Sequence, residues 1–160
     1  SPDYMTSLNT GIGGNDNITL GEGNNIGIGG AFNDNITSGS GRDIVAGDSV
    51  VIEFSPTTAL ATQVTSLDSS IGGNDIMKLG DGDNVGIGGA FDDTIECGTG
   101  NDVVAGDSVG IYFITASTSP EFITSLDTGI GGDDNCVPKV GRAFRGHKLC
   151  RKSKTSFKVS

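Results

Sequence analysis

Polar and apolar residues recur along residues 13–48 at a fixed step of nine. Each step has a Gly-rich run, then a carboxylate or amide, then β-branched or aliphatic residues. The carboxylate and amide positions are Asp16, Asn25, Asp34 and Asp43. Gly, Asn and Asp favour tight turns, whereas β-branched residues favour strands. The pattern therefore predicts a turn and a short strand every nine residues, and two such units make one coil of eighteen residues.

Pairs of apolar or small residues support the eighteen-residue period. They lie two and four residues after the polar position in the first and third units, and one and three residues after it in the second and fourth. Both arrangements have the two-residue spacing of side chains on one face of a strand. We expect all four pairs to point into one thin core: Ile18/Leu20, Ile26/Ile28, Ile36/Ser38 and Ile44/Ala46.

The whole ladder appears again 59 residues later. Its polar positions are Asp75, Asn84, Asp93 and Asp102, and its expected inward pairs are Met77/Leu79, Val85/Ile87, Ile95/Cys97 and Val103/Ala105. The same step carries TSLNTGIGGND (6–16) onto TSLDSSIGGND (65–75) and TSLDTGIGGDD (124–134). Three copies thus begin alike. Because SPEFITSL (119–126) matches SPDYMTSL (1–8), we expect residue 1 to lie inside a copy of a longer array.

A different kind of segment follows each ladder, at residues 49–64 and 108–123. VVIEF (50–54) and GIYFI (110–114) are typical of strands, and turn residues and a second strand come after each of them. A solvated linker would have fewer aromatic and β-branched residues, so we expect a β-hairpin packed on the coils. The predicted organisation is a first copy with its hairpin (1–64), a second copy with its hairpin (65–123), the start of a third copy (124–135) and a tail (136–160).

Charge divides the chain into two regions. All 20 acidic residues lie within residues 1–135, where Arg42 and Lys78 are the only basic residues, so this body carries a net charge of −18. We expect such a body to attract cations and not nucleic acid. The other eight basic residues lie in the tail, between Lys139 and Lys158, with no acid among them. Gly makes up 27 of the 160 residues and Trp is absent, which argues against a thick core.

No stretch approaches the roughly 18 apolar residues of a transmembrane helix, so we expect no membrane-spanning segment. Residues 1–10 lack the charged and apolar regions of a signal peptide. We therefore expect the start of the chain to be a cut within a larger protein.

At this point the sequence resembles the hemolysin-type calcium-binding (RTX) repeats, whose nonapeptide is G-G-x-G-x-D-x-U-x. The best-matching segments are GGAFNDNIT (29–37), SGSGRDIVA (38–46), GGAFDDTIE (88–96) and CGTGNDVVA (97–105). The copies of 59 residues with an inserted hairpin are similar to arrays of large secreted bacterial proteins. The resemblance implies a right-handed parallel β-roll with calcium held between stacked turns, in an extracellular, secreted or cell-surface protein.

The resemblance covers residues 11–48 and 70–107 and reaches 129–135. The chain departs from the nonapeptide at two kinds of position. Asn replaces the ligand Asp, and Phe replaces the Gly at the fourth position; these residues are Asn25, Asn84, Phe32 and Phe91. The departures predict weaker or empty calcium sites at the affected turns.

Stacked coils would also bring like charges together. Asp16 would stack on Asp34, and Asp75 on Asp93, about 4.8 Å apart. At an effective dielectric constant near 20, two such charges repel by about 3 kcal/mol. Calcium removes this repulsion, because it takes about six to eight oxygen ligands and accepts carboxylates and carbonyls together.

Counting Asn25 with Asp43 and Asn84 with Asp102 as further pairs, we expect four calcium sites. Turn glycines would supply carbonyl ligands, because Gly readily adopts φ > 0 and can turn its C=O group inward. The expected ligands are Asp16, Asn25, Asp34, Asp43, Asp75, Asn84, Asp93 and Asp102, with Gly14, Gly30, Gly39, Gly41, Gly73, Gly89, Gly98 and Gly100.

Two alternatives concern the same residues. Gly, Asn and Asp also occur in turns that bind nothing, but eight turns in phase favour calcium over turn chemistry alone. GTGND (98–102) resembles flat ice-binding rolls of the same family, yet Ser40 stands where a stacked Thr would be needed. Asp48 and Asp107, in the repeated AGDSV, close each ladder, and the sequence leaves open whether they are last ligands or caps.

Catalysis has little support. His147 is the only histidine; it lies in the basic tail, with no Gly-x-Ser-x-Gly motif or metal-hydrolase spacing near it. The carboxylates belong to a repeat, which indicates structure and not one differentiated acid–base pair. We expect this chain not to be an enzyme.

The cysteines and the tail are less informative. Cys97 aligns with Ser38 at an inward position, which predicts a buried thiol. Cys136 aligns with Met77, and it could pair with Cys150 in an extracellular setting, although the sequence does not fix the pairing. The tail breaks the ladder after residue 135, so we expect it to be disordered or non-native. The alternative is a basic tail that contacts acidic glycan, lipid or the acidic body.

Together these patterns predict a calcium-binding repeat module of a secreted structural or adhesive protein, which folds and stiffens when it binds calcium. Its expected partners are calcium, neighbouring copies of the array and extracellular glycans or matrix. Two other functions stay open: a calcium-dependent secretion and stability module of a larger exported enzyme, and a glycan- or ice-binding surface.

Overall fold

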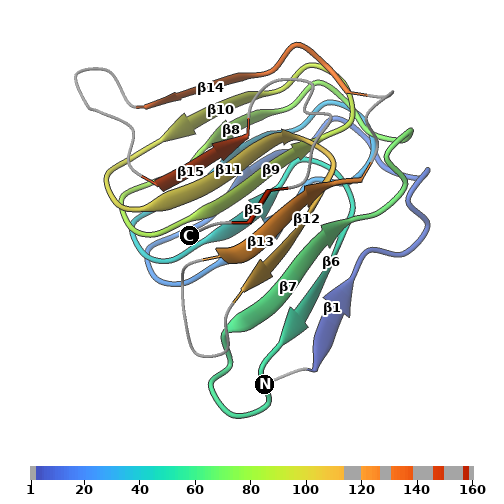
Figure 1. Cartoon of the computed structure of the whole chain (residues 1–160). Coiled ribbons are helices and arrows are strands. Elements are labelled where there is room, and N and C mark those ends of the chain that lie inside the picture. Colours follow the sequence, from blue (N-terminus) through green and yellow to red (C-terminus); the bar gives the residue numbers. More distant parts are fainter. Residues whose placement is uncertain (1–2, 114–119, 127–130, 139–145, 150–156, 159–160) are drawn as a thin grey trace.

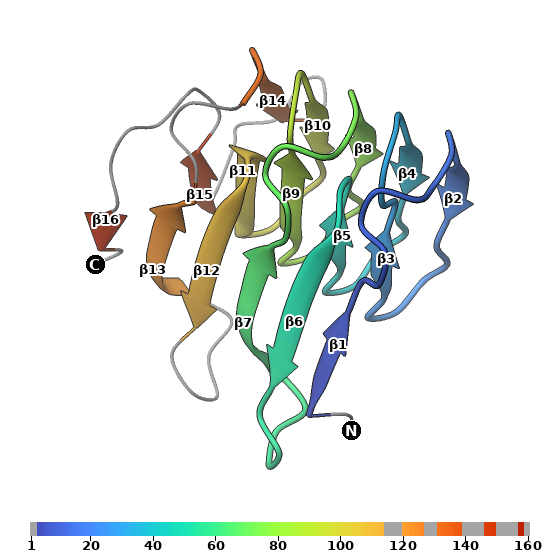
Figure 2. The ribbon, with the colours of Figure 1, turned by 90° about the vertical axis from the view of Figure 1, so that its right-hand side faces the viewer.

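The computed structural model describes residues 3–113, 120–126, 131–138, 146–149 and 157–158. Within these residues the chain forms strands and no helix, which confirms the all-β class. The strands make three sheets that lie in three layers, as Figure 1 and Figure 2 show. We name them the outer sheet, the middle sheet and the hairpin sheet.

The outer and middle sheets are parallel and have five strands each. The outer sheet, in the order β14-β10-β8-β4-β2, consists of Asn135–Pro138, Thr94–Cys97, Ile76–Lys78, Asn35–Thr37 and Asn17–Thr19. The middle sheet, in the order β15-β11-β9-β5-β3, consists of Gly146–Leu149, Asp102–Asp107, Val85–Gly89, Ile44–Ala46 and Ile26–Ile28. Successive coil strands alternate between the two sheets, so each coil contributes one strand to each.

Equivalent residues of successive coils stand next to each other. Ile18 pairs with Ile36, Ile36 with Met77, and Met77 with Ile95. The first and last of these steps are the predicted eighteen residues. The middle step is 41 residues, because a hairpin leaves the coil between β5 and β8. The stack of coils is therefore continuous from the first copy into the second.

The hairpin sheet is antiparallel and collects the segments between the ladders. In the order β1-β6-β7-β12-β13-β16, it consists of Tyr4–Thr6, Val50–Phe54, Ala61–Ser66, Val109–Phe113, Pro120–Ser125 and Phe157–Lys158. β6 pairs with β7 and β12 with β13, so both predicted hairpins form. β7 also pairs with β12, which joins the hairpins of the two copies. The turn of the second hairpin, residues 114–119, lies outside the described residues.

The molecule has two apolar cores. The core between the outer and middle sheets consists of Ile36, Val45, Met77, Leu79, Ile95, Cys97, Val104 and Cys136. The core between the middle and hairpin sheets includes Ile44, Ala46, Val85, Ile87, Val103 and Ala105 from the coils, and Val50, Ile52, Val64 and Ile111 from the hairpins. The hairpins thus pack on the coils, as the sequence predicts.

The prediction that every coil pair points into one core is wrong for the middle sheet. Ile44/Ala46 and their equivalents face the hairpin sheet, and the residue between the members of each pair faces the interior of the coil. That residue is glycine in the first coil of each copy, at Gly27 and Gly86, and valine in the second, at Val45 and Val104, because the coil interior is narrow. A Cβ added at Gly27 would lie only 2.8 Å from the Leu20 side chain. The bulky residues therefore occupy the face that the hairpins cover.

The sequence predicts that the ladder ends at Asn135. This prediction is wrong, because the ladder continues into the tail. β14 pairs with β10, β15 with β11 and β16 with β13, so three short stretches of the tail are strands and not disordered. Parallel pairing uses backbone groups, and a tail of any charge can supply them. Cys136 also provides an apolar side chain at the inward position that Met77 holds two coils earlier. It is 2% exposed.

The cysteines differ in state. Cys97 is a thiol and is 1% exposed, which confirms the predicted buried thiol. Cys136 is disulfide-bonded. Cys150, its candidate partner in the sequence, lies outside the described residues.

Candidate metal centre

Five aspartates form a column along the edge where the chain passes from the middle to the outer sheet. We name this the A edge, and its column is Asp16, Asp34, Asp75, Asp93 and Asp134. The backbone N–H of each residue donates to Oδ1 of the next, over 2.7, 2.7, 2.8 and 3.0 Å along the column. The predicted stacks of Asp16 on Asp34 and of Asp75 on Asp93 are present. The column also continues across both hairpins, from Asp34 to Asp75 and from Asp93 to Asp134.

In four of these carboxylates, all except Asp16, the second oxygen is buried and has no hydrogen-bond partner. Asp34 is 2% exposed, and Asp75 and Asp93 are each 1% exposed. Their Oδ2 atoms accept no hydrogen bond, and neither does that of Asp134. A buried acceptor without a donor costs about 1–3 kcal/mol, and more when it is charged. These oxygens therefore require a cation or a proton.

Glycine carbonyls converge on the same oxygens. A Cβ added at Gly29 would clash with both Asp34 Oδ2 and the carbonyl oxygen of Gly47. The same arrangement places Asp75 Oδ2 beside the Gly88 carbonyl, and Asp93 Oδ2 beside the Gly106 carbonyl. In each case a carboxylate oxygen and a carbonyl oxygen border the same position, although the Gly47 and Gly88 carbonyls also accept a backbone N–H, over 2.8 and 3.2 Å. A calcium ion takes this kind of ligand, since it binds carboxylate and carbonyl oxygens together.

Burial changes the protonation of the column. Loss of solvation, together with the charges of neighbouring carboxylates, raises the pKa of Asp75 to about 7 and that of Asp93 to about 10. The backbone N–H donors act in the opposite direction but are outweighed. Burial likewise raises the pKa of Asp48 to about 8. Without a cation, the folded chain would therefore hold protons on these groups near neutral pH.

These raised pKa values predict how pH acts on the metal-free chain. A group with a higher pKa in the folded state adds stability below its unfolded pKa, about 4 for Asp, and loses it as the pH rises through the folded pKa. For Asp75 and Asp48 that loss falls near pH 7 to 8. With chelator present, we expect more β signal in far-UV circular dichroism at about pH 5 than at about pH 8. A signal that is equal or weaker at the lower pH would contradict this expectation.

Asp48 is a cap. Its Oδ1 accepts a hydrogen bond from the Gly73 N–H over 3.1 Å, and its Oδ2 accepts one from the Ala90 N–H over 2.6 Å. It therefore ties the start of the first hairpin segment to the next two A-edge turns. Asp107 holds the equivalent position in the second copy and is 4% exposed.

The opposite edge, where the chain returns to the middle sheet, carries a second column. We name it the B edge, and its members are Asn25, Asp43, Asn84 and Asp102. Their backbone N–H groups and Oδ1 atoms form the same chain of hydrogen bonds, over 2.8, 2.9 and 3.1 Å. The predicted pairs, Asn25 with Asp43 and Asn84 with Asp102, are both present.

The two asparagines reduce the need for a cation at the B edge. The Asn25 amide donates from Nδ2 to the carbonyls of Gly21 and Gly23, over 2.7 and 2.9 Å. Asn84 donates in the same way to its own turn, over 2.9 and 3.2 Å. The amide N–H₂ group thus stands where a cation would otherwise satisfy those carbonyls. Asp43 lacks this group, and its buried Oδ2 has no partner.

The turn glycines permit close stacking. Four of the eight predicted ligands have positive φ: Gly30, Gly41, Gly89 and Gly100. Gly14, Gly39, Gly73 and Gly98 do not. The carbonyls that meet buried carboxylates belong to Gly47, Gly88 and Gly106, which the sequence analysis missed. The repeat itself could have identified them, because Gly47 and Gly106 are 59 residues apart and Gly88 and Gly106 are eighteen apart. Phe32 and Phe91 also have positive φ, 76° and 75°, at the fourth position of the nonapeptide, where the repeats that the sequence resembles have Gly.

Gly82 provides a direct test of this stacking. It has a φ of 129°, and an added Cβ would clash with the carbonyl of Gly41 one coil away. We expect Gly82→Ala to lower the free energy of unfolding by about 2 kcal/mol or more. Gly21→Ala is the matched control, because nothing lies within 4 Å of its added Cβ. Similar thermal midpoints for the two variants, measured with calcium present, would refute the stacking argument.

Within the described residues, no three Asp, Glu, His or Cys side chains group closely enough to hold a metal. A cation at either edge would therefore depend on backbone carbonyls. No match to the chain exists among protein-family models, curated proteins or solved structures. None of the described residues forms a helix long and apolar enough to span a membrane.

Proposed function

We propose that this chain is a calcium-binding repeat module of a secreted structural or adhesive protein, folded as a right-handed β-roll of the RTX type. One observation carries the proposal: the buried Oδ2 atoms of Asp34, Asp75 and Asp93 lack donors and lie beside glycine carbonyls. The same arrangement recurs coil after coil, so the cation would tie each turn to the next. Calcium binding would then be coupled to folding.

The ligand chemistry favours calcium over other metals. Only oxygens converge at the A edge, and no His or Cys side chain joins them in the described part of the chain. Zinc and later transition metals prefer nitrogen and sulfur ligands. Magnesium demands regular octahedral geometry and keeps several waters, which a buried, carbonyl-rich turn does not accommodate.

Two observations support an extracellular structural role. Cys136 is disulfide-bonded, and disulfides persist mainly in oxidising compartments. Each copy also adds strands to all three sheets and continues the A-edge column, so an array would form one continuous stack. Such an array is quasi-one-dimensional, since each repeat contacts only its neighbours, and this suits an extended structural protein.

Isothermal titration calorimetry tests the proposal. The chain should bind at least three calcium ions, because three carboxylate oxygens are each paired with a glycine carbonyl. Magnesium should bind about tenfold more weakly or not at all. A stoichiometry below one calcium per chain, or equal affinity for the two metals, would refute the proposal.

A further inference from the structure

The first copy contains the short motif Asn-Ile-Thr twice. The two motifs are the whole of β2, Asn17–Thr19, and of β4, Asn35–Thr37. No other asparagine of the chain has Ser or Thr two positions later. Asn-x-Thr, where x is not Pro, is the acceptor motif of N-linked glycosylation. The motif alone occurs by chance in many proteins, so its position in the fold decides whether it can be used.

Both motifs present their Asn and Thr side chains to solvent. The first and third residues of a three-residue strand lie on one face, and the isoleucine between them lies on the other, where Ile36 is part of the core. Asn17, Thr19 and Asn35 are exposed, and Thr37 is half-buried. In the described part of the chain no further sheet covers this face of the outer sheet, as Figure 2 shows. A glycan on either asparagine would therefore project away from the core.

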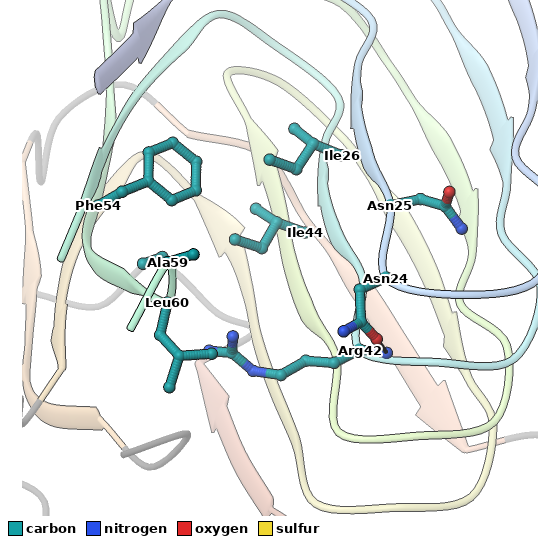
Figure 3. Close-up of a pocket in the computed structure, with 9 residues that line it drawn as sticks. Asn24, Asn25, Ile26, Arg42, Ile44, Phe54, Ala59 and Leu60 are labelled. Carbon is teal, nitrogen blue, oxygen red and sulfur yellow. Dashed lines mark hydrogen bonds between the residues drawn. The ribbon is translucent and has the colours of Figure 1, made fainter. Parts of the chain in front are cut away.

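The fold uses the side chains of other asparagines but not of these two. Asn24 accepts a hydrogen bond from the Arg42 N–H, and Asn25 donates into its own turn, beside the small pocket in Figure 3. Among the described residues, the side chains of Asn17 and Asn35 make no hydrogen bond. Their Nδ2 atoms are thus available for modification without loss of a structural contact.

The sheet does not require Asn or Thr at these positions. Asn17 pairs with Asn35, and other residue types continue the row: Ile76, Thr94 and Asn135. Different residue types likewise continue the row of Thr19 and Thr37: Lys78, Glu96 and Val137. The second copy therefore forms the same strands without the motif. The pairing of Asn with Thr in both coils of the first copy is not a requirement of the repeat.

We propose that Asn17 and Asn35 accept N-linked oligosaccharides while the chain is being secreted. The donor would be an oligosaccharide carried on a polyprenyl diphosphate. Nδ2 of the asparagine forms a bond to C1 of the first sugar, and the bond from C1 to the diphosphate oxygen breaks. The diphosphate leaves with the electron pair of that bond, and the amide gives one proton to a base of the transferase. The motif threonine is the part of the acceptor that the transferase recognises together with the asparagine.

Transfer would come before the coils stack. In the folded chain β4 pairs with β2 on one side and with β8 on the other, at a strand spacing of about 4.8 Å, so its backbone cannot enter the groove of an enzyme. The Cys136 disulfide fits this route, because disulfides form in oxidising compartments such as the lumen of the endoplasmic reticulum. The inference rests on the secreted location proposed above but on none of the calcium ligands.

The test is to secrete the whole chain from mammalian cells, behind a cleavable signal peptide, and to measure its mass before and after treatment with peptide-N-glycosidase. We expect the treatment to lower the mass and to leave Asp in place of Asn at positions 17 and 35, as peptide mass spectrometry would show. The same chain made in the bacterial cytosol should keep its mass. A glycan at only one of the two positions would overturn the assignment of the other.

Matched variants test the motif without removing either asparagine. Thr19→Val should abolish the glycan at Asn17 alone, and Thr37→Val the glycan at Asn35 alone. Thr94→Val changes the same face outside any motif and should leave both glycans in place. Circular dichroism with calcium verifies that each variant folds.

A secreted chain without glycan at either position, or glycan that persists in the Thr19→Val/Thr37→Val double variant, would overturn the proposal. Calorimetry on that secreted chain separates the two proposals, because calcium binding by an unmodified chain would contradict the glycosylation but not the calcium function.

Discussion

Removing calcium is expected to convert the folded chain into a largely disordered one. Residues 1–135 carry a net charge of −18, and the A-edge carboxylates are buried next to one another. In the described residues the core between the outer and middle sheets has only eight buried apolar side chains, so apolar burial alone compensates poorly for this repulsion. Under the proposed function, calcium binds only the folded state and therefore supplies the missing stability. Far-UV circular dichroism at about pH 7.5 should show a β spectrum with about 1 mM calcium and a coil spectrum with chelator.

Salt provides the control for this experiment. Monovalent salt screens exposed charges but barely affects buried pairs, so sodium chloride at about 0.15 M should not restore the β spectrum. Magnesium at the same concentration as calcium should restore little of it. A β spectrum that persists unchanged in chelator would show that the column is satisfied by protons and does not require a metal.

Asp93→Ala is expected to raise the calcium concentration at the folding midpoint by about tenfold or more. Asp93 Oδ1 accepts a hydrogen bond from the Asp75 N–H, and the unpartnered Oδ2 lies beside the Gly106 carbonyl oxygen. The substitution removes a proposed calcium ligand and also leaves a buried N–H without its acceptor. Asn25→Ala should change the midpoint much less, since its side chain already satisfies its turn without a metal.

Asp93→Asn separates the two effects of that substitution. Asparagine keeps the Oδ1 acceptor and replaces Oδ2 with an amide N–H₂ group, which can donate to the Gly106 carbonyl as Asn84 does within its own turn. We expect this variant to fold with one fewer calcium ion bound, by calorimetry, and with a smaller midpoint shift than Asp93→Ala. Equal midpoints for Asp93→Ala, Asp93→Asn and Asn25→Ala would mean that the carboxylate has no special role.

The repeat made the coil strands predictable, but it could not say which face of each strand meets which neighbour. Period-two alternation places Ile44 and Ala46 on one face and Val45 on the other, and both faces of the middle sheet are buried. When a strand is covered on both sides, hydrophobicity no longer distinguishes inside from outside. The useful signal was size, because Gly27 and Gly86 mark the narrow interior.

The A-edge aspartates were also predictable, but their full extent was not. An eighteen-residue step connects Asp16 to Asp34 and Asp75 to Asp93. The inserted hairpin lengthens the step from Asp34 to Asp75 to 41 residues, so the eighteen-residue pattern does not show it. The carbonyl partners Gly47 and Gly106 lie beside the hairpins and appear in the sequence only as ordinary small residues. The pairing of Asn135–Pro138 was missed because the tail changes composition while the backbone continues the sheet.

Each copy adds strands to all three sheets at once, and this has a mechanical consequence. One copy of 59 residues adds two strands to each sheet, so it lengthens the stack by about 10 Å. The same residues would span about 200 Å if pulled straight. Tension along the stack would detach strands from its end. Each coil of eighteen residues that is released would lengthen the chain by about 60 Å. A protein built in this way would be short and stiff at rest and would yield in discrete steps under load.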